Sequence, residues 1–201
     1  MIKALFVDIG GVIVVNRARE VGEKFQNKKG LSIDITKKIF HFLQMDERSE
    51  GDFTTFLREQ GVDENTWDRF LIEFYGSESR NDELIDLLKH AKAKGIKIVI
   101  TTNNGSTVRK GMEKYGILDL PDLLINSSEY HMTKPDPAYW EVALQETRKL
   151  LPEIQPAEIL VIDDSKTNCL SAKEFGFEVY QYLNEPESQK DISEIIFESR
   201  F

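Results

Sequence analysis

Residues 4–12 read ALFVDIGGV, an apolar run that leads through Asp8 directly into a Gly-Gly turn. Residues 159–165, ILVIDDS, repeat this arrangement with Asp163 and Asp164. Buried parallel strands read as near-continuous apolar runs, because both faces of their sheet are covered. Open α/β sheets bind ligands beyond the carboxyl ends of such strands. We therefore predict that the three carboxylates gather in one crevice at the edge of a parallel sheet.

Two other segments bring polar groups to the same predicted edge. Residues 98–103, IVITTN, end an apolar run on Thr102 and Asn103, and residues 133–135, TKP, supply Lys134. Carboxylates, a hydroxyl and an ammonium group together suit the handling of a phosphate with a divalent cation. Each segment also has an ordinary interpretation: an Asp at a strand end can cap a helix, Thr-Asn can form a turn, and a Lys before a Pro is commonly solvated.

The composition bounds the class of protein. The chain has 201 residues with a net charge of −9, which suits one soluble globular domain or one domain with a modest insert. Generic binding to nucleic acid or to an anionic membrane is disfavoured, although a local Lys and a metal allow a small phosphorylated substrate. Cys169 has no partner for a disulfide, and no apolar run approaches a membrane span. We expect a cytoplasmic protein, with a monomer as the default.

The pattern of strands and helices predicts an α/β fold. The expected strands lie at about 2–8, 96–102, 122–126, 158–163 and 177–183. Helical patterns separate them, and the last stretch, 184–201, is expected to form a terminal helix on the sheet. Strand–helix alternation is typical of parallel βαβ units, so a Rossmann-like sheet is predicted.

Residues 16–80 break this alternation with about four helical segments, which hold most of the aromatic residues. Their apolar faces predict a small helical subdomain with its own core, which can also cover the crevice as a lid. The expected division is an α/β core at 1–15 and 81–201 and a helical cap at 16–80.

Four motifs in order resemble those of the haloacid dehalogenase-like (HAD) hydrolase superfamily, over nearly the whole chain. The subgroup that the chain resembles has an inserted helical cap and includes small-molecule phosphatases similar to glucose-1-phosphate phosphatases. The resemblance implies hydrolysis of a small phosphate monoester through an aspartyl-phosphate on Asp8. It also implies a phosphate-binding hydroxyl at Thr102, a cation at Lys134 and metal-binding acids at Asp163 and Asp164.

The resemblance implies ligand sets as well. Magnesium would be held by Asp8, Asp164 and the backbone carbonyl of Gly10, with Asp163 as a ligand directly or through water. Phosphate oxygens would be held by the side chains of Thr102 and Lys134 and by three backbone N–H groups, those of Gly10, Gly11 and Asn103.

One departure from the family pattern concerns Gly10. Most phosphatases of this superfamily carry a second Asp there, which acts as general acid and base, a contribution of roughly 10²–10⁴-fold. Three interpretations remain: an active phosphatase whose leaving group needs little help, a catalytically weak protein that binds phosphate and metal, or a dehalogenase. A dehalogenase needs no metal and gives no reason for adjacent Asp163 and Asp164.

A few weaker sequence features each allow a functional and an ordinary interpretation. Residues 45–53 resemble a polar cap segment of this subgroup, in which Arg48 could reach a substrate or be a solvated loop charge. Asn16 and Arg17 are candidates for a hinge or a substrate contact. His131 lies three residues before Lys134 and either approaches the crevice or stays outside it.

Overall fold

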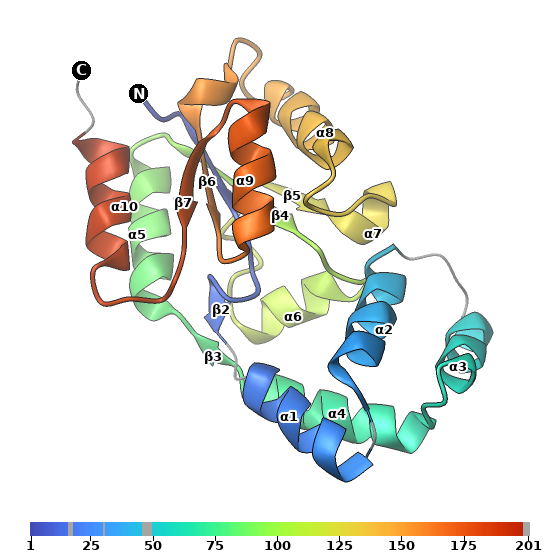
Figure 1. The fold of residues 1–201 in the computed structure, drawn as a ribbon. Helices are drawn as coiled ribbons and strands as arrows, with labels where there is room; N and C mark the ends of the chain where they lie inside the picture. The colour runs from blue at the N-terminus through green and yellow to red at the C-terminus, as the bar shows by residue number, and fades with distance from the viewer. Residues whose placement is uncertain (16–17, 30, 46–49, 199–201) are drawn as a thin grey trace.

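The structure is a computed structural model that describes residues 1–15, 18–29, 31–45 and 50–198 (Figure 1). Its centre is a five-stranded parallel sheet with strand order β5-β4-β1-β6-β7. The strands are β1 (Ala4–Val7), β4 (Lys97–Thr102), β5 (Leu123–Asn126), β6 (Ile159–Asp163) and β7 (Glu178–Gln181). The predicted Rossmann-like sheet is confirmed.

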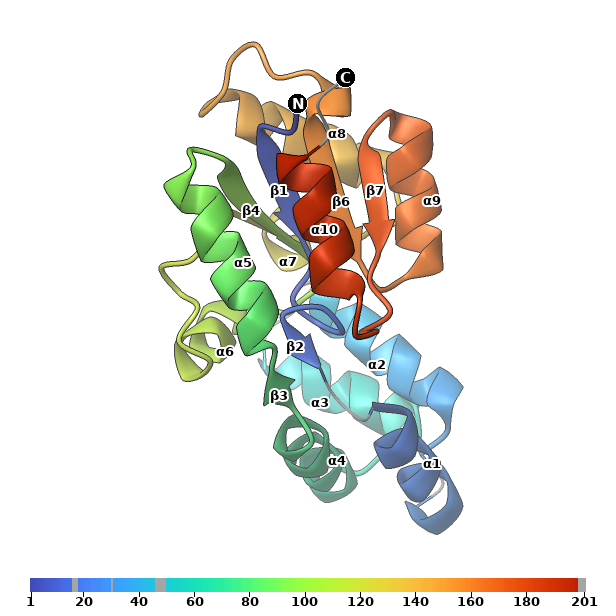
Figure 2. The ribbon, with the colours of Figure 1, turned by 90° about the vertical axis from the view of Figure 1, so that its left-hand side faces the viewer.

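Helices cover both faces of this sheet, which explains why its central strands are apolar throughout. On one face α5 (Asp82–Ala93), α6 (Val108–Lys114) and α10 (Ser188–Phe197) share an apolar cluster with β1 side chains such as Leu5 and Val7. On the other, α8 (Pro137–Arg148) and α9 (Lys166–Phe175) share a second cluster with Ala4 and Phe6. Figure 2 shows α5 and α10 in front of the sheet and α8 behind it.

Local signals set the ends of the core helices. The side chains of Asn81, Asp136 and Ser165 accept hydrogen bonds from backbone N–H groups in the first turns of α5, α8 and α9. These caps satisfy donors that a helix leaves unpaired at its N-terminus. Gly176 ends α9 with a φ of 104°, a left-handed conformation that favours glycine.

Four helices between β1 and α5 form a helical insert: α1 (Ala18–Lys29), α2 (Ile33–Met45), α3 (Glu50–Glu59) and α4 (Glu64–Gly76). The insert has its own cluster of buried apolar side chains, which includes Ile39, Trp67 and Phe70. Trp67 and Phe70 stack with ring centroids 5.2 Å apart. Figure 1 shows the insert on the side of the sheet where β1 ends.

Four short elements have no strong sequence signal. The strands β2 (Val14–Val15) and β3 (Ser79–Arg80) pair antiparallel, where the chain enters and leaves the insert. The helix α7 (Ser127–Tyr130) follows β5, and the 3₁₀ turn η1 (Pro156–Glu158) precedes β6. Elements of this length are too short to show a hydrophobic period.

No helix within the described ranges is long and apolar enough to cross a lipid bilayer.

Candidate active site

Three strand ends place the candidate residues side by side. Strand β1 pairs with both β4 and β6, so the residues at the carboxyl ends of these strands are neighbours. Asp8 directly follows β1, Thr102 is the last residue of β4 and Asp163 is the last residue of β6. The backbone N–H of Asp8 donates to the carbonyl of Ile162 at 3.0 Å, which fixes Asp8 beside β6.

Lys134 enters this edge of the sheet from the loop before α8, and its side chain is fully buried. Its Nζ donates to Asp163 Oδ2 at 2.6 Å and to the carbonyl of Thr101 at 2.8 Å, and lies 3.3 Å from Asp8 Oδ1. Burial alone would lower the pKa of Lys134, but the charges of Asp8 and Asp163 outweigh burial, so the pKa is raised. The ammonium group therefore stays charged between the two carboxylates.

The side chain of Asn103 holds the Lys134 loop in place. Asn103 Nδ2 donates to the carbonyl of Lys134 and Asn103 Oδ1 accepts from the N–H of Lys134, both at 2.9 Å. The sequence predicted only a backbone contribution from Asn103. This reciprocal pair spans 31 positions of the chain, a separation that leaves no local signal in the sequence.

Asp163 is fully buried and both of its oxygens are engaged. Oδ1 accepts from the N–H of Ser165 at 2.9 Å and from Asn168 Nδ2 at 3.0 Å, while Oδ2 accepts from Lys134. Asn168, in the first turn of α9, was not singled out from the sequence. The signal that could have found it is an amide side chain in the first helical turn after a strand that ends on Asp.

Asp164 differs from Asp163 because its residue is exposed. Burial and the neighbouring Asp163 raise the pKa of its carboxyl, against the opposing charge of Lys134. A Cβ on Gly11 would lie 2.5 Å from Asp164 Cγ and closer still to its Oδ2. Gly11 also has a φ of 76°. Only glycine therefore lets the turn after β1 approach Asp164 this closely.

The carboxylates of Asp8, Asp163 and Asp164 fit a hard divalent cation. One oxygen from each lies within 4.8 Å of the others. Mg²⁺ takes oxygen ligands and keeps several waters, so it suits a cluster with one exposed member. Because both oxygens of Asp163 already accept hydrogen bonds, Asp8 and Asp164 have the greater freedom to coordinate directly.

The carboxyl group of Asp8 has a pKa well above the ordinary value for an aspartate. Burial raises its pKa to about 7, Lys134 opposes this effect, and the charges of Asp163 and Asp164 add to it. Oδ1 of Asp8 also accepts from the N–H of Ile9 at 2.7 Å. A bound cation would favour the carboxylate form of Asp8, because it offsets the two neighbouring negative charges.

The predicted phosphate donors have different surroundings. The N–H groups of Gly10 and Asn103 have no acceptor within the part of the chain that the structure describes. The N–H of Gly11 donates to the carbonyl of Val14 at 2.8 Å. Thr102 is 1% exposed and lies at the same edge.

The remaining candidates from the sequence either contact the helical insert or lie outside the described residues. The imidazole of His131 contacts the helical insert, with Nδ1 2.8 Å from the carbonyl of Met45. Asn16, Arg17 and Arg48 lie outside the described residues.

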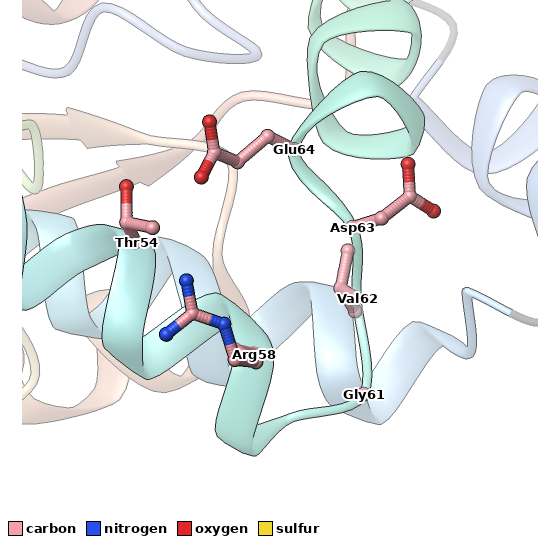
Figure 3. A pocket seen from close by; sticks show the side chains of 6 residues that line it. All are labelled: Thr54, Arg58, Gly61, Val62, Asp63 and Glu64. Atoms are coloured by element: carbon pink, nitrogen blue, oxygen red, sulfur yellow. The ribbon is translucent and has the colours of Figure 1, made fainter.

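A depression of about 350 Å³ lies elsewhere, at the corner between α3 and α4 of the insert (Figure 3). Its walls are Thr54, Arg58, Gly61, Val62, Asp63 and Glu64. All six belong to the insert, so this depression is separate from the carboxylate cluster.

Known proteins resemble this chain in sequence pattern and in fold. The sequence profile of the haloacid dehalogenase-like hydrolase family matches residues 2–176. No curated protein matches the sequence significantly.

Solved structures resemble the whole fold. A predicted HAD-like family hydrolase from Porphyromonas gingivalis superposes with a TM-score of 0.78 at 20% identity, over 98% of each chain. A HAD family enzyme from Bacteroides thetaiotaomicron, in complex with magnesium and inorganic phosphate, has a TM-score of 0.67 at 25% identity, over 90% of this chain and 93% of that one. A HAD phosphatase from Thermococcus onnurineus has a TM-score of 0.64 at 20% identity, over 100% of both chains.

Proposed function

The chain belongs to the haloacid dehalogenase-like hydrolase family, and from this premise we propose that it hydrolyses a small phosphate monoester through an aspartyl-phosphate formed on Asp8. The observation that carries the proposal is the buried ammonium group of Lys134 between Asp8 and Asp163, beside the exposed Asp164. Such an arrangement offers a nucleophile and positive charge to one phosphate group.

The first half of the proposed reaction uses Asp8 as nucleophile. A carboxylate oxygen of Asp8 attacks phosphorus, the bond from phosphorus to the ester oxygen breaks, and the alcohol leaves with a proton from solvent. The Nζ of Lys134 stabilises negative charge on the phosphoryl oxygens, as do the hydroxyl of Thr102 and the N–H groups of Gly10 and Asn103.

In the second half, water attacks phosphorus of the acyl phosphate and the bond from phosphorus to the Asp8 oxygen breaks. Inorganic phosphate is released, a proton of the water passes to solvent, and the Asp8 carboxylate is regenerated. Magnesium, when bound, supplies positive charge that offsets repulsion between Asp8 and the substrate phosphate. Asp8, Asp164 and the carbonyl of Gly10 would hold it. Asp163 would contribute charge and hold Lys134 in place, or act as a ligand through water.

We assign Gly11 a steric role, because its N–H is already bonded to Val14. Its missing side chain leaves room for the Asp164 carboxylate.

We also propose that the helical insert, expected at residues 16–80, acts as a cap over the site and restricts it to small substrates. Its support is the contact between the end of α2 and the core segment that follows β5. The cytoplasmic location and the monomeric state expected from the sequence stay predictions.

A second candidate function is favoured by Gly10. Without a carboxyl group there, the protein could bind phosphate and magnesium yet turn over poorly, as an interaction module. A dehalogenase is disfavoured, because a reaction without metal gives no reason for the exposed Asp164 beside Asp163.

Phosphate release from a panel of sugar and aryl phosphates separates these candidates. The panel is run with Mg²⁺ and with a chelator, for the wild type and for Asp8→Asn. The phosphatase proposal expects release that needs Mg²⁺ and is lost in the variant. The absence of release from every substrate, with Mg²⁺ still raising the melting temperature, would favour the interaction module.

A further inference from the structure

The short helix α7 links two parts of the molecule that are far apart in the sequence. Figure 1 shows it beside the C-terminal end of α2, the insert helix nearest to the core. On its other side lies the loop after β4, which contains Asn103 and Asn104. Asn126, just before α7, donates from Nδ2 to the carbonyl of Gly105 in that loop at 3.1 Å.

The hydroxyl of Ser127 lies at the centre of this junction and is fully buried. Ser127 Oγ accepts from the N–H of Asn104 at 3.0 Å. It has two possible acceptors for its single proton, the carbonyl of Gln44 at 2.9 Å and the carbonyl of Asn104 at 3.1 Å. One hydroxyl therefore contacts both the insert and the loop.

A second contact reinforces the junction on the insert side. The imidazole of His131, just after α7, lies with Nδ1 2.8 Å from the carbonyl of Met45. Since a carbonyl only accepts, Nδ1 carries the proton here. Gln44 and Met45 are the last two residues of α2, whose carbonyls have no partner within the helix. The core thus caps the C-terminus of α2 from outside.

The loop that Ser127 holds is the one next to the candidate phosphate site. Asn103 precedes Asn104, its N–H is a proposed phosphate donor, and its side chain holds the Lys134 loop. A shift of the Asn104 peptide would therefore move the Asn103 N–H and Lys134 together.

We propose that Ser127 is a positioning residue that couples docking of the helical insert to the geometry of the phosphate-binding loop. When the insert is docked, the Ser127 proton is shared with Gln44. When the insert moves away, the carbonyl of Asn104 remains of the two acceptors described here, and the loop peptide changes its hydrogen bonding. Phosphate in the site and the insert on the core then favour each other, because such coupling is reciprocal.

This inference rests on the proposed phosphate site, and its test reads out binding rather than turnover. Amide hydrogen exchange is followed in α2 with and without Mg²⁺ and inorganic phosphate. In the wild type, phosphate is expected to slow exchange in the last turn of α2. In Ser127→Ala we expect this slowing to be lost. The apparent Kd for phosphate should rise about fivefold, which is the change in affinity that corresponds to the loss of one typical hydrogen bond.

Ser128→Ala is the matched control. Ser128 is also buried and also lies in α7, but its hydroxyl accepts from Asn126 Nδ2 at 2.7 Å, within the core. We expect this variant to keep the phosphate-induced slowing. If Ser127 only stabilised the fold, the two serine variants would lose stability to a similar extent. In that case, phosphate would still slow amide exchange in α2 of Ser127→Ala.

If Ser127→Ala fails to fold, His131→Ala provides the test, because His131 is exposed and its ring holds only the insert side of the junction. It is expected to weaken the slowing in α2. Slowing of the wild-type size in Ser127→Ala, or in His131→Ala if the serine variant does not fold, would overturn the coupling. So would the absence of slowing in a wild type that binds phosphate. If phosphate slows exchange in α2 but the protein releases phosphate from no substrate, the proposed hydrolysis is wrong and the coupling stands.

Discussion

Replacing Gly10 by an aspartate supplies the carboxyl group that most phosphatases of the family carry at this position. The structure has room for it, because Gly10 is exposed and a Cβ there would have no atom within 4 Å. The φ of Gly10 is not in the left-handed region, unlike that of Gly11. An L-residue is therefore accommodated without backbone strain.

The expected gain depends on the leaving group. General acid catalysis contributes about 10²–10⁴-fold when the leaving group needs a proton. The introduced side chain would be a fourth carboxylate beside Asp8, Asp163 and Asp164, whose negative charges limit how readily it gives up its proton. We therefore expect a gain at the low end, about 10²-fold in kcat/KM for an alkyl phosphate. For an aryl phosphate, whose leaving group needs little assistance, we expect almost none.

The assay compares kcat/KM for one alkyl and one aryl phosphate in the wild type, Gly10→Asp and Gly10→Asn. The Asn variant has a similar shape but donates no acidic proton. An equal gain for both substrates, or an equal gain from Asn, would refute general acid catalysis at this position. No gain at all in a variant that still binds Mg²⁺ would refute the view that Gly10 limits the rate.

Three other changes test the surroundings of the site. Gly11→Ala should reduce the stabilisation of the fold by Mg²⁺ in thermal melts, because its Cβ would overlap Asp164; unchanged stabilisation would contradict this steric role. Lys134→Ala should lower the free energy of unfolding by about 3–5 kcal/mol in urea titrations, since it leaves the buried Asp163 without its cation, and a loss below about 1 kcal/mol would refute this pairing. The pKa of Asp8 is raised to about 7, so folding favours the protonated carboxyl group. The contribution of this carboxyl group to stability is therefore full below about pH 4 and is lost as the pH rises through 7. Without metal, Asp8→Asn should therefore melt higher than the wild type at about pH 8 and not at about pH 4; a difference independent of pH would contradict the raised pKa.

The burial of Lys134 changes an expectation drawn from the sequence. Taken alone, the position of Lys134 before a proline indicated a solvated side chain. Its Nζ is instead enclosed by Asp163, the carbonyl of Thr101 and Asp8. Burial depends on which segments pack over a residue, and the pattern TKP does not carry that information.

The parts of the fold that were predictable have local causes. Apolar runs ending at Asp8 and Asp163 indicated strands and their carboxyl ends, because burial on both faces imposes such runs. The helical insert was visible as four segments of helical period between residues 16 and 80. The roles of the site residues themselves stay predictions.

The parts that were missed depend on contacts between distant residues. The pair Ser127 and Gln44 lies 83 positions apart, and the pair Asn103 and Lys134 lies 31 apart. Strands β2 and β3 have two residues each, too short for any period. Hydrogen bonds of this kind arise only after the chain has folded, so a single sequence holds no repeating pattern that reveals them.

The most direct test of the central claim is to trap the phosphoryl group on the protein. The enzyme is mixed with Mg²⁺ and its best substrate, quenched in acid and reduced with borohydride, which converts an aspartyl-phosphate into homoserine. Peptide mass spectrometry then locates the modified residue. We predict that Asp8 is the residue converted to homoserine, and that the conversion is absent without substrate and absent in Asp8→Asn. A phosphoryl group trapped on another residue, or turnover that survives Asp8→Asn, would contradict the role of Asp8 as nucleophile.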